Sequence, residues 1–300
     1  MSYLGRRLLL SAALLLALSL AAFLLLSVAP GHFLSAELMD PQRSPAAVAE
    51  WVRTQGLDRP WPVRYAGWLR SCAVGSCGTS LGYGLPVSGL IAARLPRTVA
   101  IVIPAWVAGW TLGLAAAWLC AWRRPLRQAA EPALVIAGML PEVVSGSLLL
   151  WLAVGWGLPV EGAWLPVLIL TISLAAVVFL HASDALAEAH AARFVRVAQA
   201  RGIAGWTLWY CYVLPAAANP LVSLLGPSLA GVAGSALAAE ALTGWPGLGP
   251  LFLDAFQMRD YPVVQAVLVL LGALLTVASL AGDLLLYRLD ARIRTDGEQR

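Results

Sequence analysis

The sequence predicts an all-α membrane protein with about six transmembrane helices. Of its 300 residues, 60% are hydrophobic and only 12% are charged, and the mean hydropathy is +0.78. This composition excludes an ordinary soluble domain. Six apolar runs are long enough for a helix to cross the roughly 30 Å hydrocarbon core of a bilayer. Helices are expected because lipid offers no partner to backbone polar groups, and a helix satisfies its own.

The charged residues exclude two classes of function. All 20 basic residues are arginine, so the chain has no lysine to bind ATP phosphates, and no GxxxxGK[ST] motif is present. The net charge of +4 is small, and the arginines flank apolar runs instead of forming a face for nucleic acid. The sequence also shows no nucleophile–base pair and no zinc motif. His181, Asp184 and Glu188 fall on one predicted helical face, which is interpreted as a solvated polar face, with a weak metal cluster as the alternative. We therefore expect a chain without enzymatic activity, cofactor or metal of its own.

The N-terminal third is expected to hold one span and one long loop. Residues 8–29 are apolar or small and follow two arginines. A cleaved signal peptide is the alternative, but its apolar region is usually about 7–15 residues long. Residues 1–29 are therefore interpreted as a tail and a retained first span. Residues 30–97 then form an extracytoplasmic loop with a short helix over 45–56.

Two cysteines in that loop leave an alternative open. Cys72 and Cys77 form a disulfide if the loop faces an oxidising compartment, and stay free thiols otherwise. Their spacing alone does not decide between the two states.

Five further spans are expected over about 98–122, 133–154, 164–183, 216–239 and 263–287. Their orientation follows from the arginines. Twelve of the 20 lie at the N-terminus, in the connections 123–131 and 184–215, and in the C-terminal tail, whereas the short connections on the other side hold one, Arg259. By the positive-inside rule both termini are cytoplasmic, and the 30–97 loop is long enough to escape the rule.

The connection 184–215 contains a basic segment that is typical of a docking element. A glycine, Gly202, separates two short predicted helices, and Leu214-Pro215 opens the next apolar run. Small residues would let the backbone of another protein approach closely; they are Ala198, Ala200, Gly202 and Ala204. The alternative is a basic loop such as any polytopic membrane protein has on its inner side.

The connection 240–262 has an unusual composition. It is too apolar for an exposed loop and too broken by glycine and proline for a span. We expect a short helix that lies at, or dips into, the outer face of the membrane.

The basic segment resembles the cytoplasmic "EAA" loop of ABC importer permeases. Gly202 and Leu214-Pro215 have the spacing of that motif, with Tyr212 in its aliphatic position. Arg196 and Val197 replace the Glu and first Ala of the motif, and Arg at this place is typical of the dipeptide/oligopeptide/nickel branch.

Other segments resemble the same branch, so that the resemblance covers nearly the whole chain. WPGLG at 245–249 and RDYPVVQ at 259–265 match it closely, and so does the tail 289–294. Two departures occur in the 30–97 loop, where His32 and Ser76 replace aspartates of the family.

The resemblance implies the type I ABC importer permease fold in a bacterial inner membrane, with residues 98–300 as the permease core. It makes 184–215 the loop that couples to the ATPase and 240–262 an outer-face gate. The implied coupling residues are Arg193, Arg196, Ala198, Arg201, Gly202, Leu214 and Pro215. The implied gate residues are Glu240, Trp245, Pro246, Gly247, Gly249, Arg259, Asp260, Tyr261 and Pro262.

The resemblance also implies partners and a function. The expected partners are a second, similar permease chain, two nucleotide-binding subunits that bind ATP and Mg, and an extracytoplasmic solute-binding protein. Together they would import peptides or a related small solute, with nickel and metal chelates as further candidates. A stand-alone secondary carrier or channel is the alternative. It predicts inverted internal repeats or charged residues in broken helices near mid-bilayer; no repeat is convincing here, and Glu142 is the only central acid.

One carboxylate inside a predicted span is a candidate for the translocation pathway. Glu142 follows Pro141 about ten residues into the 133–154 span, where a proline can kink the helix. An ionisable residue at this depth is costly and therefore a functional candidate. The alternative is a structural carboxyl group that is protonated or paired with an arginine.

Overall fold

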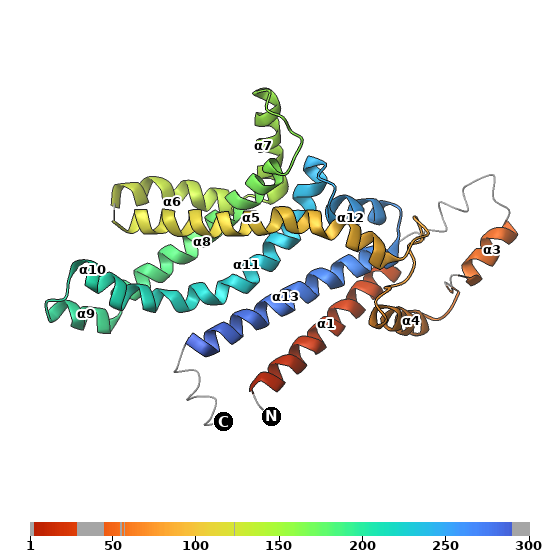
Figure 1. Ribbon diagram of the computed structural model, residues 1–300, viewed down its shortest axis with the longest axis horizontal. Helices are drawn as coiled ribbons and strands as arrows, with labels where there is room; N and C mark the ends of the chain where they lie inside the picture. Colours follow the sequence, from red (N-terminus) through yellow and green to blue (C-terminus); the bar gives the residue numbers. More distant parts are fainter. Residues whose placement is uncertain (1–2, 29–44, 55, 57, 123, 290–300) are drawn as a thin grey trace. The chain divides into compact units, whose positions relative to one another are not determined.

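The computed structural model describes residues 3–28, 45–54, 56, 58–122 and 124–289 (Figure 1). His32 and the tail from Asp290 onward lie outside the described residues. The helices are α1 (Tyr3–Val28), α3 (Pro45–Thr54), α4 (Trp61–Ala73), α5 (Val87–Trp122), α6 (Arg124–Met139), α7 (Glu142–Gly155), α8 (Trp164–Ala191), α9 (Arg193–Ala200), α10 (Gly205–Leu208), α11 (Leu214–Thr243), α12 (Leu248–Gln257) and α13 (Tyr261–Leu289). The described part contains no strand, only an isolated bridge between Thr79 and Pro86.

The helices confirm the predicted fold class. Five of them are long and apolar enough to cross a membrane, and a bent pair, α6 with α7, makes a sixth candidate span. The second span begins earlier than predicted, at Val87. The apolar run is interrupted by Arg94 and Arg97, but a helix can continue past arginines outside the bilayer.

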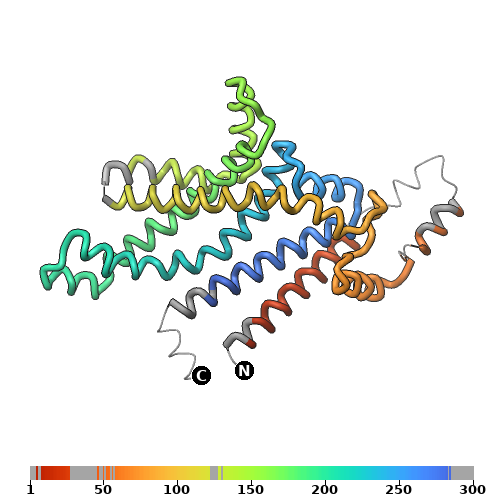
Figure 2. The backbone as a smooth tube through the Cα atoms, viewed as in Figure 1, coloured from red at the N-terminus to blue at the C-terminus, as the bar shows by residue number. Residues whose placement is uncertain are grey.

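The third span was predicted as one kinked helix over 133–154, and this is wrong in detail. Helix α6 ends at Met139, α7 begins at Glu142, and the two are bent by 107° (Figure 2). Pro141 is the N-cap residue of α7. Because proline has no N–H to continue a helix and clashes with the preceding turn, it ends α6 rather than bending it. Glu142 thus lies in the first turn of a new helix.

The chain forms two compact units. Unit 1 comprises Met1–Arg97 and Pro246–Ala273, and unit 2 comprises Thr98–Trp245 and Leu274–Arg300. Within unit 1, α4 lies against the second half of α1, where Tyr65 contacts the ring of Phe23 and the hydroxyl of Ser19. Residues 30–97 were expected to hold one short helix, α3, and α4 is an additional one.

Small residues allow the helices of unit 2 to pack closely. A Cβ at Gly109 or Gly113 of α5 would lie 2.7 Å from side-chain atoms of α8. At Gly226 of α11 it would lie 2.1 Å from the backbone oxygen of Ala278 in α13. Backbones in contact through glycines are the usual way in which helices associate within a membrane.

Candidate functional site

The basic segment folds as predicted, into two short helices with a break at glycine. We call residues 193–213 the docking segment. Helix α9 ends in a Schellman motif, in which the Gly202 N–H donates to the Gln199 carbonyl at 2.9 Å and the Ile203 N–H to the Ala198 carbonyl at 3.1 Å. Gly202 has φ +82°, a conformation that L residues rarely adopt. The residue type at this position is therefore a requirement of the backbone.

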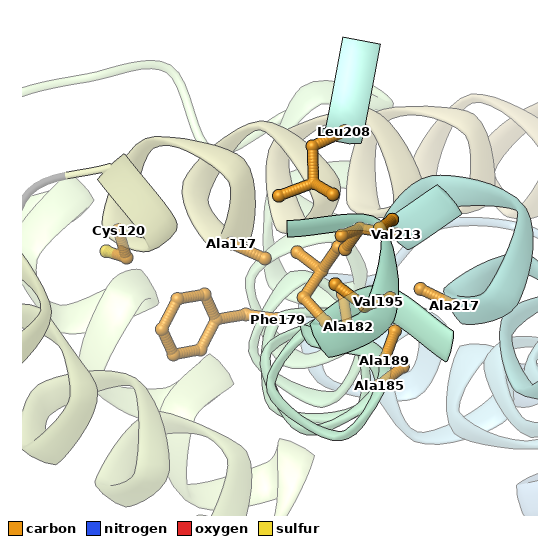
Figure 3. Packing of buried hydrophobic residues seen from close by; sticks show 12 residues of the cluster. Ala117, Cys120, Phe179, Ala182, Ala185, Ala189, Val195, Leu208, Val213 and Ala217 are labelled. Atoms are coloured by element: carbon orange, nitrogen blue, oxygen red, sulfur yellow. The ribbon is translucent and has the colours of Figure 1, made fainter. Parts of the chain in front are cut away.

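A buried core fixes the docking segment to three long helices. Val195, Leu208 and Val213 of the segment are at most 5% exposed and converge on the alanine-rich face of α8 (Figure 3). The members contributed by α5, α8 and α11 are Ala117, Cys120, Phe179, Ala182, Ala185, Leu186, Ala189 and Ala217. The segment is thus part of the same packed body as these spans, and not a loose connection.

Ala198 is buried, although it was predicted to be accessible to the backbone of another protein. It is 3% exposed and belongs to this core, so it is not available to the backbone of another protein. The other three small residues, Ala200, Gly202 and Ala204, are exposed. A helical periodicity explains the difference, since Val195 and Ala198, three residues apart, share the inward face of α9.

The opposite face of the docking segment is both cationic and apolar. The three arginines of the segment, Arg193, Arg196 and Arg201, are exposed. Phe194 is 49% exposed and Val197 51% exposed. On the second half of the segment, the exposed rings of Trp206 and Tyr210 stack with centroids 5.7 Å apart. Exposed apolar groups bordered by charge are typical of a protein-binding surface.

The Leu214-Pro215 pair follows a turn of π-helix. Residues Trp209–Val213 form this turn, and the Leu214 N–H donates to the carbonyl of Trp209, five residues earlier. Pro215 cannot donate, and in a regular α-helix its ring would clash with the preceding turn. The wider turn accommodates the proline, so that α10 and α11 continue as one candidate span from Gly205 to Thr243.

The predicted outer-face residues fall in two places. Glu240 is fully buried in α11, which continues past it to Gly244, a residue with φ +70° that ends the helix. The backbone carbonyl of Glu240 accepts a hydrogen bond from the Trp245 N–H at 3.0 Å. The remaining residues surround α12, where Gly247 is the N-cap residue and Gly249 is buried; Pro246 accepts a hydrogen bond from Arg97 at 3.4 Å.

Asp260 joins two segments that are 180 residues apart in the chain. Its carboxylate is fully buried and accepts hydrogen bonds from the hydroxyl of Ser80 and, at 3.1 Å each, from the N–H groups of Leu81 and Gly82. Sequence reasoning missed these three partners, although the glycine-rich patch around them was a signal of unusual backbone. The preceding residue, Arg259, has φ +57°. Tyr261 and Pro262 open α13 directly after this contact.

Glu142 lines a cavity of about 260 Å³ in unit 2. Ser235 of α11 donates a hydrogen bond to Glu142 Oε1 at 2.8 Å, so its partner here is a hydroxyl. Ser173, which also lines the cavity, has a buried hydroxyl with no hydrogen-bond partner among the described residues. Ser228 accepts hydrogen bonds from two indole N–H groups at 3.0 Å each. The cavity thus combines apolar walls with one carboxylate and a few hydroxyls.

The two cysteines of the first loop are free thiols in this structure. Burial raises the pKa of the Cys72 thiol to about 12, and the neighbouring Cys77 adds to the rise through a hydrogen bond and its charge. Whether the pair oxidises depends on the compartment, as the sequence already indicated.

Comparison with known proteins identifies the family. Residues 109–295 match the model of the binding-protein-dependent transport system inner membrane component. The oligopeptide transport system permease protein AppB of Bacillus subtilis (strain 168) is 28% identical, covering 97% of this chain and 99% of its own. The glutathione transport system permease protein GsiC of Escherichia coli (strain K12) is 29% identical, covering 98% and 99%.

A solved structure shows the same fold. It is an inward-facing form of the MetNI methionine ABC transporter, with a TM-score of 0.60 and 21% identity over 68% of this chain and 98% of that one. The fold agrees with the type I importer fold that the sequence predicted. The helical architecture and the match over most of the chain lead to one conclusion: this protein belongs to the binding-protein-dependent transport system inner membrane component family, as a permease subunit of an ABC importer.

Proposed function

We propose that this chain forms half of the translocation pathway of an ATP-driven peptide importer. In this proposal a second permease chain of the same family forms the other half. Two nucleotide-binding subunits bind ATP and Mg, and an extracytoplasmic binding protein delivers the cargo. Both termini lie in the cytoplasm of a bacterial cell, so reporter fusions at Pro125 and Ala200 would lie inside and fusions at Pro60 and Pro250 outside.

The observation that carries the proposal is the two-faced docking segment. Its inner face is fixed to α5, α8 and α11 by buried side chains, and its outer face presents arginines beside exposed Phe194 and Val197. If the ATPase binds to the outer face, its movement would therefore be transmitted through the docking segment directly to the spans. Arg196 and Arg201 would contact acidic groups of the ATPase, because guanidinium groups bind carboxylates with two parallel hydrogen bonds.

The proposed cargo is a peptide with a free amino group. AppB is named for oligopeptides and GsiC for glutathione, and both kinds of molecule carry an ammonium group. In the cavity of unit 2, Glu142 offers a carboxylate beside hydroxyl groups, which suits an ammonium group that has lost part of its water. Nickel and metal chelates are the other cargo class that the resemblance implied. The ligand trapped in the co-purified binding protein would distinguish the two classes.

Affinity purification from native membranes, with mass spectrometry of the bound proteins, tests the whole proposal. We expect a second permease, P-loop ATPase subunits and a binding protein. Recovery of the chain alone, together with transport that needs no ATP, would contradict the proposal. The double variant Arg196→Glu/Arg201→Glu tests the docking surface: it should remain in the membrane and lose the ATPase. Arg53→Glu, at an exposed arginine of α3, is the matched control and should retain the ATPase.

A further inference from the structure

A second cavity, in unit 1, is lined by hydrogen-bond donors. It has a volume of about 320 Å³ and lies between the end of α1, helix α4, the glycine-rich loop and the start of α13. We call it the Arg59–Arg64 cavity. Its polar lining side chains are Arg59, Arg64, Trp68, Ser71, Thr79, Tyr261 and Gln265. None of them belongs to the docking segment or to the cavity around Glu142.

Two donors in this cavity lack a partner. The indole N–H of Trp68 and the side-chain amide nitrogen of Gln265 are buried and have no hydrogen-bond partner among the described residues. Gln265 is only 2% exposed. A buried donor without an acceptor lowers the stability of the fold, and folded proteins pair the great majority of such groups. Both side chains line this cavity, so a ligand with acceptor oxygens that enters it would satisfy these donors.

The charge of the cavity specifies the acceptor. Arg59 and Arg64 add two guanidinium groups to these two donors, and none of the described residues that line the cavity is an acid. The acid next to the cavity, Asp260, already accepts hydrogen bonds from the 80–82 loop. A ligand that fits these groups has several acceptor oxygens and a negative charge, as a phosphate group has.

The cavity lies at the level where two candidate spans reach the membrane surface. Phe23 is four residues from the end of the Leu8–Ser27 span, and Gln265 is four residues from the start of the Tyr261–Gly282 span. The Arg64 guanidinium lies 5.7 Å from the centre of the Phe23 ring. Aromatic side chains are enriched at this depth, and arginine side chains commonly reach the interface from span ends. The oxyanion that is abundant at this level is the phosphate of phospholipids.

We propose that the Arg59–Arg64 cavity binds the headgroup phosphate of an anionic membrane phospholipid. The two arginines pair with the phosphate, and the N–H groups of Trp68 and Gln265 donate to its remaining oxygens. A lipid with net negative charge is preferred over a zwitterionic one, because the cavity holds two positive charges and a choline group would add a third. The bound lipid would hold α4 against the spans α1 and α13.

Native mass spectrometry of the purified, delipidated full-length chain tests this. Dioleoyl phosphatidylglycerol, dioleoyl phosphatidylcholine and inorganic phosphate are titrated separately. Wild type should bind phosphatidylglycerol most tightly, and Arg59→Gln/Arg64→Gln should weaken that binding on the order of tenfold or more, the loss expected for charged hydrogen bonds. Trp68→Phe, which keeps the ring and removes the N–H, should weaken it by a smaller factor. Arg70→Gln, at an exposed arginine of α4 outside the cavity, is the matched control and should bind as wild type does.

Three results would overturn the proposal. Unchanged binding in the double variant would show that the arginines do not hold the lipid. An equal loss in Arg70→Gln would show that only the general charge of α4 matters. Binding of inorganic phosphate without binding of phosphatidylglycerol would show that the oxyanion is a free ion and not a lipid headgroup.

Discussion

The buried carboxylate of Asp260 should control the stability of the loop over residues 78–86. It accepts three hydrogen bonds, from the Ser80 hydroxyl and the Leu81 and Gly82 N–H groups. Hydrogen bonds to charged groups contribute about 1.5–3 kcal/mol each. Taking the lower value for each of the three bonds, because the two N–H groups are only partly buried, Asp260→Ala should reduce the free energy of local opening by about 4–5 kcal/mol.

Hydrogen exchange followed by mass spectrometry measures this directly. A loss of 1.4 kcal/mol corresponds to a factor of ten, so exchange of the Leu81 and Gly82 amides should accelerate on the order of a hundredfold or more. Ser80→Ala removes one of the three bonds to Asp260 and also the bond that the Ser80 Oγ accepts from the Tyr83 N–H at 2.9 Å. It should accelerate exchange on the order of tenfold to a hundredfold. Asp254→Ala, on the neighbouring helix α12, is the control and should leave the loop unchanged.

A wild-type exchange rate in the 78–86 peptide of Asp260→Ala would contradict this prediction. The loop would then be held by its own turns.

Three further predictions concern packing, cargo and thiol chemistry. Gly226→Ala places a Cβ 2.1 Å from the Ala278 carbonyl and should lower the thermal midpoint of the detergent-solubilised protein by a clear margin, as overpacking costs typically 1–3 kcal/mol; Gly234→Ala, with nothing within 4 Å on the same helix, should leave it unchanged or raise it. Glu142→Gln should abolish a preference for free-amine over N-acetylated peptides in uptake assays, and an intact preference would assign the carboxylate to structure alone. Because the pKa of Cys72 is raised to about 12, the reduced protein should alkylate there on the order of a thousandfold more slowly at pH 8 than an ordinary thiol. The rate should rise tenfold per pH unit, since only the thiolate reacts; rapid labelling at pH 8 would contradict the burial.

The sequence predicted those features that depend on local pattern. Apolar runs located the spans, and Gly202 located the break in the docking segment because a backbone with φ +82° requires glycine. The break at Pro141 was predicted only as a kink. The apolar run continues across Pro141, and composition does not show that the helix axis changes direction there. Helix α4 was not predicted, since its mixture of tryptophan and arginine gives no clear apolar period.

Contacts between distant segments were beyond local pattern altogether. Nothing near Asp260 in the sequence indicates that its partners are Leu81 and Gly82, and only the fold brings them together. The same holds for the inward position of Ala198, whose small size suits a partner's backbone and a crowded core equally well. Whether Ala198 contacts a partner or packs in the core depends on which side of α9 faces α8.

The alanines that join the docking segment to α8 leave little room for independent movement. Helix α8 has 28 residues, which corresponds to a length of about 42 Å at about 1.5 Å per residue. If the segment and α8 tilt as one body through about ten degrees, the far end of α8 moves by about 7 Å, by the geometry of a rod of that length. A small rotation of the docking segment would thus displace the other end of α8 by a distance comparable to the size of a side chain.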